Sequence, residues 1–164
     1  MSQLSTSPQA RCSGFTLLEL LIVILIAGII TFVAAGRLND VGEVNAQGFA
    51  DQVASMLRFA QEAAVAQRRL IYVNVNAGSG LVNACLDSSN ACNSPLQAPG
   101  YGGAGLVAQA PGGVALTTNT TQFSFDAMGQ PSAASQVQIH ATASDDGQQF
   151  NVTVEPVSGY VRRS

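Results

Sequence analysis

The residue with the clearest chemical consequence is Glu19, an acidic side chain within an apolar stretch. From Phe15 to Ala35 the sequence is dominated by Leu, Ile and Val, and Glu19 is its only charged residue. An acidic side chain in hydrocarbon costs around 2.5 to 3.5 kcal/mol on insertion scales, so such a residue usually has a partner or a function. The alternative is a position among lipid headgroups, near the positive end of a helix dipole.

The other side chains that could do chemistry do not form a catalytic pattern. His140 is the only histidine, and its alternating neighbours predict a strand on which it faces solvent or the next strand. The pair Asp145-Asp146, followed by Gly147, is typical of a turn. The stretch from Gly100 to Gly105 lacks the Lys and Ser/Thr of a phosphate loop. We therefore expect a protein that is not an enzyme, with no cofactor and no metal site.

A small basic cluster, Arg162 and Arg163, lies at the end of the last predicted strand. One interpretation is a solvated strand end. The other is an anion contact, since arginine binds phosphate in a bidentate fork and Tyr160 could stack on a base. The formal net charge is −3, which argues against a general electrostatic attraction to nucleic acid. Any contact with DNA would be local to these two arginines.

The apolar stretch belongs to a predicted N-terminal helix. Its length is close to the roughly 20 residues that span a bilayer core, and Arg11 before it marks the cytoplasmic side. A signal peptide cleaved near Ala35 is the competing interpretation. We expect a membrane-spanning, assembly-forming helix over 15–36 that continues as an amphipathic helix over 37–69. The core-facing positions of the second half recur every three to four residues: Phe49, Val53, Met56, Ala60 and Ala63 or Ala64.

After Arg69 the apolar period changes from helical to alternating, which predicts a β-rich head over 70–164. Short strands with close turns favour an antiparallel sheet, so the expected fold class is α+β. The Gly-rich segments 99–113 and 126–131 are expected to be loops. The predicted strands are Leu70–Val75, Leu81–Leu86, Val114–Thr117, Gln122–Phe125, Gln136–Thr142, Phe150–Glu155 and Gly159–Arg162.

The sequence Gly14-Phe15-Thr16-Leu17-Leu18-Glu19, followed by an apolar helix, resembles the class III signal of type IV pilins and pseudopilins. In that family a membrane prepilin peptidase cuts after the glycine, here Gly14, and methylates the new first residue, here Phe15. The resemblance thus implies a leader over 1–14 and a pilin fold. It also implies that Glu19 of one subunit neutralises the Phe15 ammonium of a neighbour within a helical bundle.

Later phrases resemble the GspH/FimT branch of minor pilins and pseudopilins, and most of all the minor pilins of MSHA-type pili. They are Phe49-Ala50-Asp51-Gln52-Val53, Phe59-Ala60-Gln61, Ala66-Gln67-Arg68-Arg69, Phe123–Pro131 and Val157–Arg162. The likeness implies a subunit that takes part in pilus assembly or initiation at the tip. Its implied partners are other pilins or pseudopilins, the prepilin peptidase and inner-membrane lipid.

Two alternatives stay open within this resemblance. One is a minor pseudopilin of the GspH type in type II secretion. The other is a tip-exposed pilin that binds DNA or a surface. A related branch handles DNA through a Gly-Arg-x-Arg motif near the C-terminus, but here Tyr160 replaces the first arginine, so only Arg162 matches.

The resemblance also bears on the cysteines. Cleavage after Gly14 would remove Cys12 and leave Cys85 and Cys92 as an even pair. The head would lie in the periplasm on a single-pass inner-membrane anchor, before entry into a pilus or pseudopilus. Because that compartment is oxidising, we expect a disulfide between the pair. A metal site is the alternative, although the loop between the cysteines has no histidine.

Overall fold

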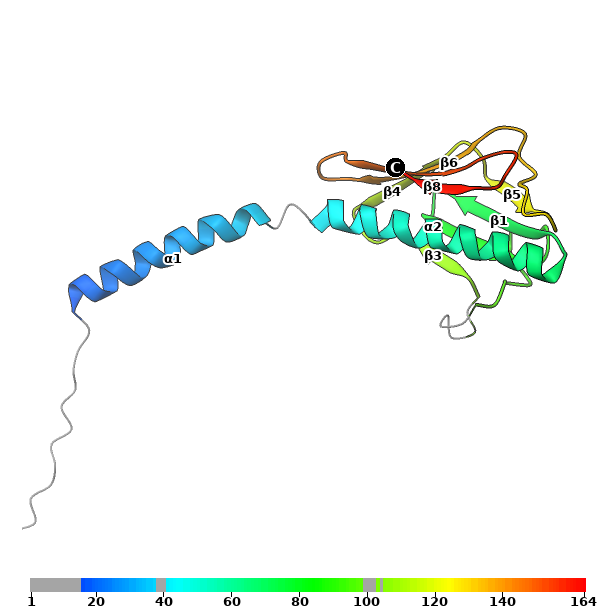
Figure 1. The fold of residues 1–164 in the computed structure, drawn as a ribbon. Coiled ribbons are helices and arrows are strands. Elements are labelled where there is room, and N and C mark those ends of the chain that lie inside the picture. The colour runs from blue at the N-terminus through cyan, green and yellow to red at the C-terminus, as the bar shows by residue number, and fades with distance from the viewer. Residues whose placement is uncertain (1–15, 38–40, 99–102, 104) are drawn as a thin grey trace, which may run out of the picture. The chain divides into compact units, whose positions relative to one another are not determined.

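A computed structural model describes residues 16–37, 41–98, 103 and 105–164. The described residues fall into two units, divided along the sequence between positions 38 and 39, and we describe each by itself (Figure 1). The predicted long helix is present as two helices, α1 (Leu17–Arg37) and α2 (Val41–Gln67). Residues 38–40, which would join the two, lie outside the described residues.

The first unit consists of α1, a helix with apolar side chains on every side. Its large hydrophobic residues between Leu17 and Phe32 are 47% to 84% exposed. A helix that is apolar all round is stable only when something else covers it. Within the part of the chain that the structure describes, no helix combines the length and the apolar content that crossing a bilayer requires.

The second unit is a head built from α2 and two antiparallel sheets, as predicted for an α+β protein. Sheet A has the order β3-β2-β1-β5, and sheet B has the order β4-β6-β7-β8. The strands are β1 (Ile71–Asn76), β2 (Leu81–Cys85), β3 (Val107–Gln109), β4 (Val114–Thr118), β5 (Gln122–Phe125), β6 (Val137–Ala143), β7 (Gln149–Val154) and β8 (Val161–Arg163).

The helix α2 packs against strands of both sheets, so one hydrophobic core joins them. Its predicted core-facing positions are all buried, including Phe49, Val53 and Met56. Phe125 of sheet A is fully buried, and its ring meets that of Phe123 edge-on at 5.4 Å between centroids. Because α2 supplies the surface that both sheets share, the position of each sheet depends on this helix.

One strand was not predicted. The segment 99–113, expected to be a loop, contains β3, which pairs with β2 through three residues such as Val82 opposite Ala108. A strand of three residues is too short to show an alternating pattern in the sequence. In the structure it is recognised by its pairing with β2 and by the burial of Ala108 in the core. The other predicted strands are present, with boundaries within two residues of those expected.

Two loops of the head meet on one side chain of α2. Gln61 donates hydrogen bonds from Nε2 to the carbonyl of Gly129 at 2.9 Å and to that of Ser158 at 3.1 Å. Gly129 belongs to the loop after β5 and Ser158 to the loop before β8, so Gln61 links the two sheets. Gly159 has a φ of +67°, and a Cβ there would overlap the carbonyl oxygen of Gly129.

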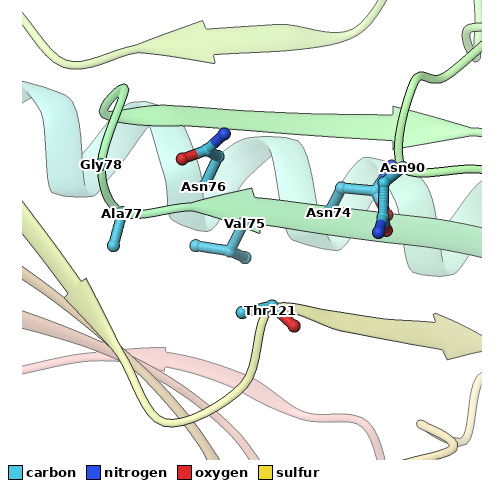
Figure 2. Close-up of a pocket in the computed structure, with 7 residues that line it drawn as sticks. All are labelled: Asn74, Val75, Asn76, Ala77, Gly78, Asn90 and Thr121. Carbon is cyan, nitrogen blue, oxygen red and sulfur yellow. The ribbon is translucent and has the colours of Figure 1, made fainter.

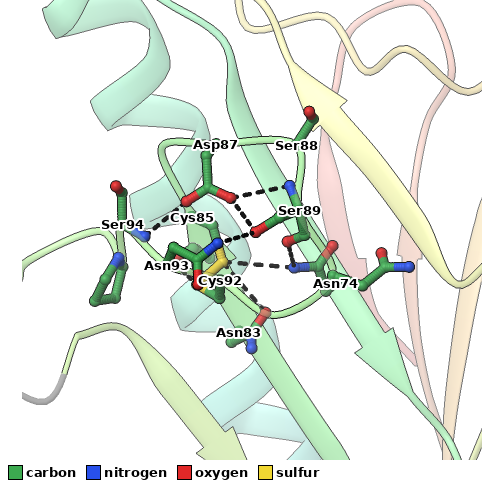
Figure 3. The surroundings of a disulfide bond; sticks show 12 residues. Asn74, Asn83, Cys85, Asp87, Ser88, Ser89, Cys92, Asn93 and Ser94 are labelled. Carbon is green, nitrogen blue, oxygen red and sulfur yellow. Dashed lines mark hydrogen bonds between the residues drawn. A yellow bond between two sulfur atoms is a disulfide. The ribbon is translucent and has the colours of Figure 1, made fainter.

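A second polar network closes the loop between Cys85 and Ser94 (Figure 3). The Asp87 carboxylate accepts hydrogen bonds from the Ser89 hydroxyl, the Ser89 N–H at 2.9 Å and the Ser94 N–H at 2.6 Å. These bonds favour the ionised carboxylate, and the bond from the Ser89 hydroxyl is the largest cause of a lowered Asp87 pKa. The loop is thus closed by a carboxylate as well as by a disulfide.

We predict that Gly159→Ala destabilises the head by about 3 kcal/mol or more, because it adds a steric overlap to an unfavourable backbone conformation. The matched control is Gly147→Ala. Gly147 has a similar φ of +74°, but nothing lies within 4 Å of an added Cβ. It should therefore cost only about 1–2 kcal/mol, the left-handed backbone term alone. Urea unfolding followed by circular dichroism measures both, and equal losses would contradict the overlap.

We also predict that Asp87 titrates below its ordinary pKa of 3.8. Because the folded-state pKa is lowered, Asp87 stabilises the folded loop above pH 3.8, and this contribution is lost as the pH falls through the folded-state pKa. Carbon-13 NMR of the Asp87 carboxyl gives the midpoint directly. Ser89→Ala removes the largest cause and should move the midpoint upward. A parent midpoint at or above 3.8 would refute the assignment.

Candidate assembly segment and contact sites

The predicted processing residues Gly14 and Phe15 lie outside the described residues. The first described turn of α1 carries Glu19. Its backbone N–H donates to the hydroxyl of Thr16 at 3.2 Å, and the N–H of Leu20 donates to the carbonyl of Thr16 at 3.2 Å. Thr16 is therefore the N-cap of α1, and Glu19 occupies the third helical position, where a carboxylate favours the positive helix end.

Sequence reasoning did not recognise this cap, although the signal is present. Thr16-Leu17-Leu18-Glu19 has the Ser/Thr-x-x-Glu spacing of a capping box just before an apolar run. The cap gives Glu19 a local role at the start of the helix. It leaves the carboxylate at the N-terminal edge of an apolar surface, where the chemistry open to it is acceptance of hydrogen bonds or pairing with a cation.

Cys85 and Cys92 form the predicted disulfide, which excludes the metal alternative for these two sulfurs. The loop that they close is tied to sheet A by carboxamides. Asn74 Nδ2 donates to the Ser89 carbonyl at 3.3 Å, and Gln122 Nε2 donates to Asn74 Oδ1 at 2.6 Å. The disulfide loop is therefore held against β1 and β5, not only closed on itself.

A pocket of about 410 Å³ opens beside this loop (Figure 2). It lies where the β1–β2 turn, the disulfide loop and the turn before β5 approach one another. Its lining carries hydrogen-bonding groups but no titratable side chain, so it offers no acid or base for proton transfer. The lining residues are Asn74, Val75, Asn76, Ala77, Gly78, Asn90 and Thr121.

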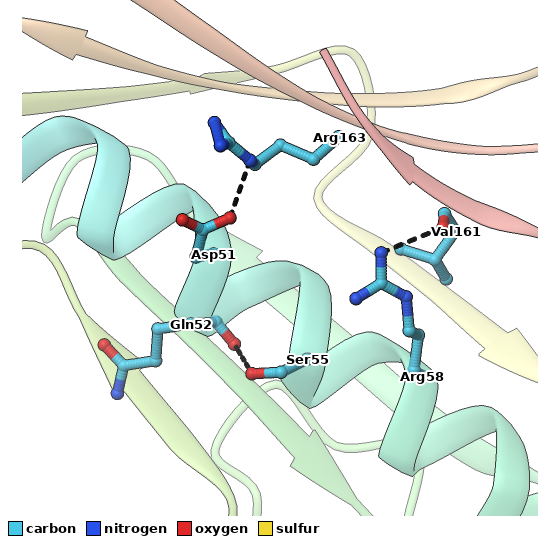
Figure 4. Close-up of polar contacts among 6 residues, drawn as sticks. All are labelled: Asp51, Gln52, Ser55, Arg58, Val161 and Arg163. Carbon is cyan, nitrogen blue, oxygen red and sulfur yellow. Dashed lines mark hydrogen bonds and ion pairs between the residues drawn. The ribbon is translucent and has the colours of Figure 1, made fainter.

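The two C-terminal arginines do not form one basic patch, because Arg163 pairs with Asp51 of α2 (Figure 4). Successive side chains of a strand point to opposite faces, and β8 places Arg162 on the exposed face. Arg163 Nε instead pairs with Asp51 Oδ1 of α2 at 2.6 Å, and its guanidinium lies 5.9 Å from the centroid of the Phe150 ring. By the same alternation Tyr160, two residues earlier, lies on the same face as Arg162, and it is 62% exposed.

The remaining candidates for chemistry are part of the scaffold. His140 lies on β6, directly opposite Asn151 of β7. The distance from His140 Nδ1 to Asn151 Oδ1 is 2.5 Å. Asp145 and Asp146 lie in the turn between β6 and β7, as predicted. Arg58 of α2 donates to the carbonyl of Val161 at 3.3 Å, which adds a second attachment of β8 to the helix.

Two solved structures share the fold of the described chain. The type IV minor pilin FimU of Pseudomonas aeruginosa matches with a TM-score of 0.60 at 14% identity, covering 74% of this chain and 90% of that one. The minor pseudopilin EpsH of the Type 2 Secretion System of Vibrio cholerae matches with a TM-score of 0.56 at 13% identity, covering 75% and 95%. No curated protein sequence matches the chain.

Two family models match the sequence itself. The prokaryotic N-terminal methylation motif matches residues 9–35, which include Gly14, Phe15 and Glu19. The model of the Type II transport protein GspH matches residues 50–158, more than half of the chain and most of the head. The leader-type motif and the head are therefore recognised independently of each other. The chain belongs to the GspH/FimT family of type IV pilin-like proteins.

Proposed function

We propose that this protein is a non-catalytic filament subunit, a minor pilin of a type IV pilus. The observation that carries the proposal is the combination of a methylation motif with a GspH-type head on one chain. The apolar surface of α1 supports it, because side chains that are exposed on every side of a helix require a lipid or protein environment.

The proposed pathway begins with cleavage after Gly14 and methylation of Phe15 by a prepilin peptidase. Before assembly the subunit is anchored in the inner membrane with its head in the periplasm. During assembly α1 moves into a helical bundle. There the free ammonium of Phe15 would be an unpaired charge in apolar surroundings. Glu19 of a neighbouring subunit can neutralise it, which favours one register of assembly.

We further propose an MSHA-like pilus and a role in assembly or initiation at its tip. The competing assignment is a minor pseudopilin of type II secretion. FimU is a minor pilin and EpsH a minor pseudopilin, and the two resemble this chain almost equally, with TM-scores of 0.60 and 0.56. Both assignments require the same processing and the same α1 chemistry, and they differ in their partner subunits.

One observation favours a second function, local DNA contact by a tip-exposed head. Tyr160 and Arg162 are both exposed and alternate onto one face of the chain at β8, where a ring and a cation could hold a base and a phosphate. Arg163, the other predicted contact, is engaged with Asp51. The proposal is therefore narrowed to Arg162, with Tyr160 beside it.

We predict that cells with a prepilin peptidase convert the full chain to a form that begins at methylated Phe15. Intact mass of the membrane-extracted protein measures both the cut and the methyl group. Gly14→Val should remain uncut, whereas Glu19→Gln should be cut but recovered poorly in sheared filaments, because it lacks the charge that neutralises Phe15. A parent chain that stays uncut, or that begins near Gly36, would refute the proposed function.

For the second function, we predict that retention of the protein on DNA falls with rising salt and falls further in Arg162→Ala. The matched control is Arg68→Ala, which removes an equal charge from another exposed position. Electrophoretic mobility shift at several salt concentrations measures the effect. Absence of retention in the parent would end this alternative, and equal losses in both variants would show a general charge effect.

A further inference from the structure

Two loop residues of the head expose large apolar side chains near the C-terminal part of α2. Met128 is 80% exposed and Val157 75% exposed. Their loops meet at Gln61, and an added Cβ at Gly129 would lie 3.3 Å from Val65, which is itself 46% exposed. We call Val65, Met128 and Val157 the loop patch. Exposed apolar side chains that gather on one part of a protein surface commonly mark an interaction site.

A groove of about 310 Å³ runs between Met128 and α2 within this patch. Most of its lining surface is apolar. It is wide enough to accept one or two side chains of another protein. The residues that line it are Gln61, Glu62, Val65, Ala66, Met128 and Gly129.

Hydrogen bonds hold the turn that exposes Met128. Asp126 Oδ1 accepts the N–H of Met128 at 2.9 Å and that of Gln130 at 2.8 Å, and the Asp126 carbonyl accepts the N–H of Gly129 at 2.9 Å. Gln61 then fixes the turn to α2. Because the turn is already ordered, a partner would lose little of its binding free energy to ordering the loop. The flexible thioether itself can adapt to the surface that covers it.

The charge of the groove limits what can cover it. Glu62 is the only charged side chain among its lining residues, and the ion pair found in the described residues, Arg163–Asp51, does not include it. Two copies of the chain meeting patch to patch about a two-fold axis would bring two Glu62 carboxylates together, which is unfavourable. A chain that brings its own cation would be attracted instead.

We propose that the loop patch is the docking surface for a different pilin-like subunit, through an apolar segment of that subunit flanked by Lys or Arg. The proposal rests on the proposed function and adds the contact surface and the chemistry of the partner. The apolar segment covers Met128 and Val157 and enters the groove beside Val65. The flanking cation pairs with Glu62.

The test uses the full chain in cells whose filaments contain it, with Met128→Asp and Val157→Asp as separate variants. Each places a charge in the contact without touching the core, since both side chains are exposed. We expect normal processing after Gly14 and an unchanged thermal midpoint, but at least about tenfold less protein in sheared filaments, equivalent to about 1.4 kcal/mol. Thr117→Asp, at an exposed position of β4, is the matched control and should enter filaments like the parent.

A photo-crosslinking residue at position 128 identifies the partner. The expected product joins this chain to another subunit that mass spectrometry shows to be processed after a glycine, and Glu62→Lys should reduce its yield. A crosslink to a second copy, or filament levels of both aspartate variants equal to the parent, would overturn the proposal. A parent chain that is uncut or absent from filaments would contradict the proposed function, and the docking proposal, which rests on it, would be overturned as well.

Discussion

Burial of one face of α2 against both sheets is the interaction on which the rest of the head depends. Strands of both sheets, β1 and β5 in sheet A and β6 and β7 in sheet B, contact the helix, and their buried side chains belong to one core with it. Close packing requires small residues on α2, and Ala50, Ala60 and Ala64 are each at most 1% exposed. The buried face of the helix thus packs against both sheets in one core.

Polar side chains along the edge of the same helix set where the later strands lie. Asp51, Arg58 and Gln61 follow one another at helical spacing. Asp51 pairs with Arg163, and Arg58 donates to the Val161 carbonyl (Figure 4). Gln61 donates to the loop carbonyls of Gly129 and Ser158. Each contact joins residues far apart in sequence. Together they place β8 and its loop along α2.

Sequence patterns predicted the elements that depend on periodicity or on residue type. The stripe from Phe49 to Ala64 and the alternation in β6 follow from burial of one face, so they are visible in a single sequence. The short strand β3 and the Arg163–Asp51 pair were not visible, because both depend on contacts between distant segments. Because Arg163 pairs with Asp51 whereas Arg162 lies on the exposed face of β8, the two arginines do not form the single basic cluster that the sequence suggested.

The two helices use apolar residues in opposite ways, and this contrast underlies the proposed function. On α2 most of the large apolar residues lie on one face and are buried, with Val44 and Val65 as exposed exceptions, whereas on α1 they surround the helix and are exposed. The core of the head is formed by residues of α2 and of the two sheets. Such a surface is costly in water in proportion to its area. In the proposed filament, many such helices would cover one another and so remove this apolar surface from water.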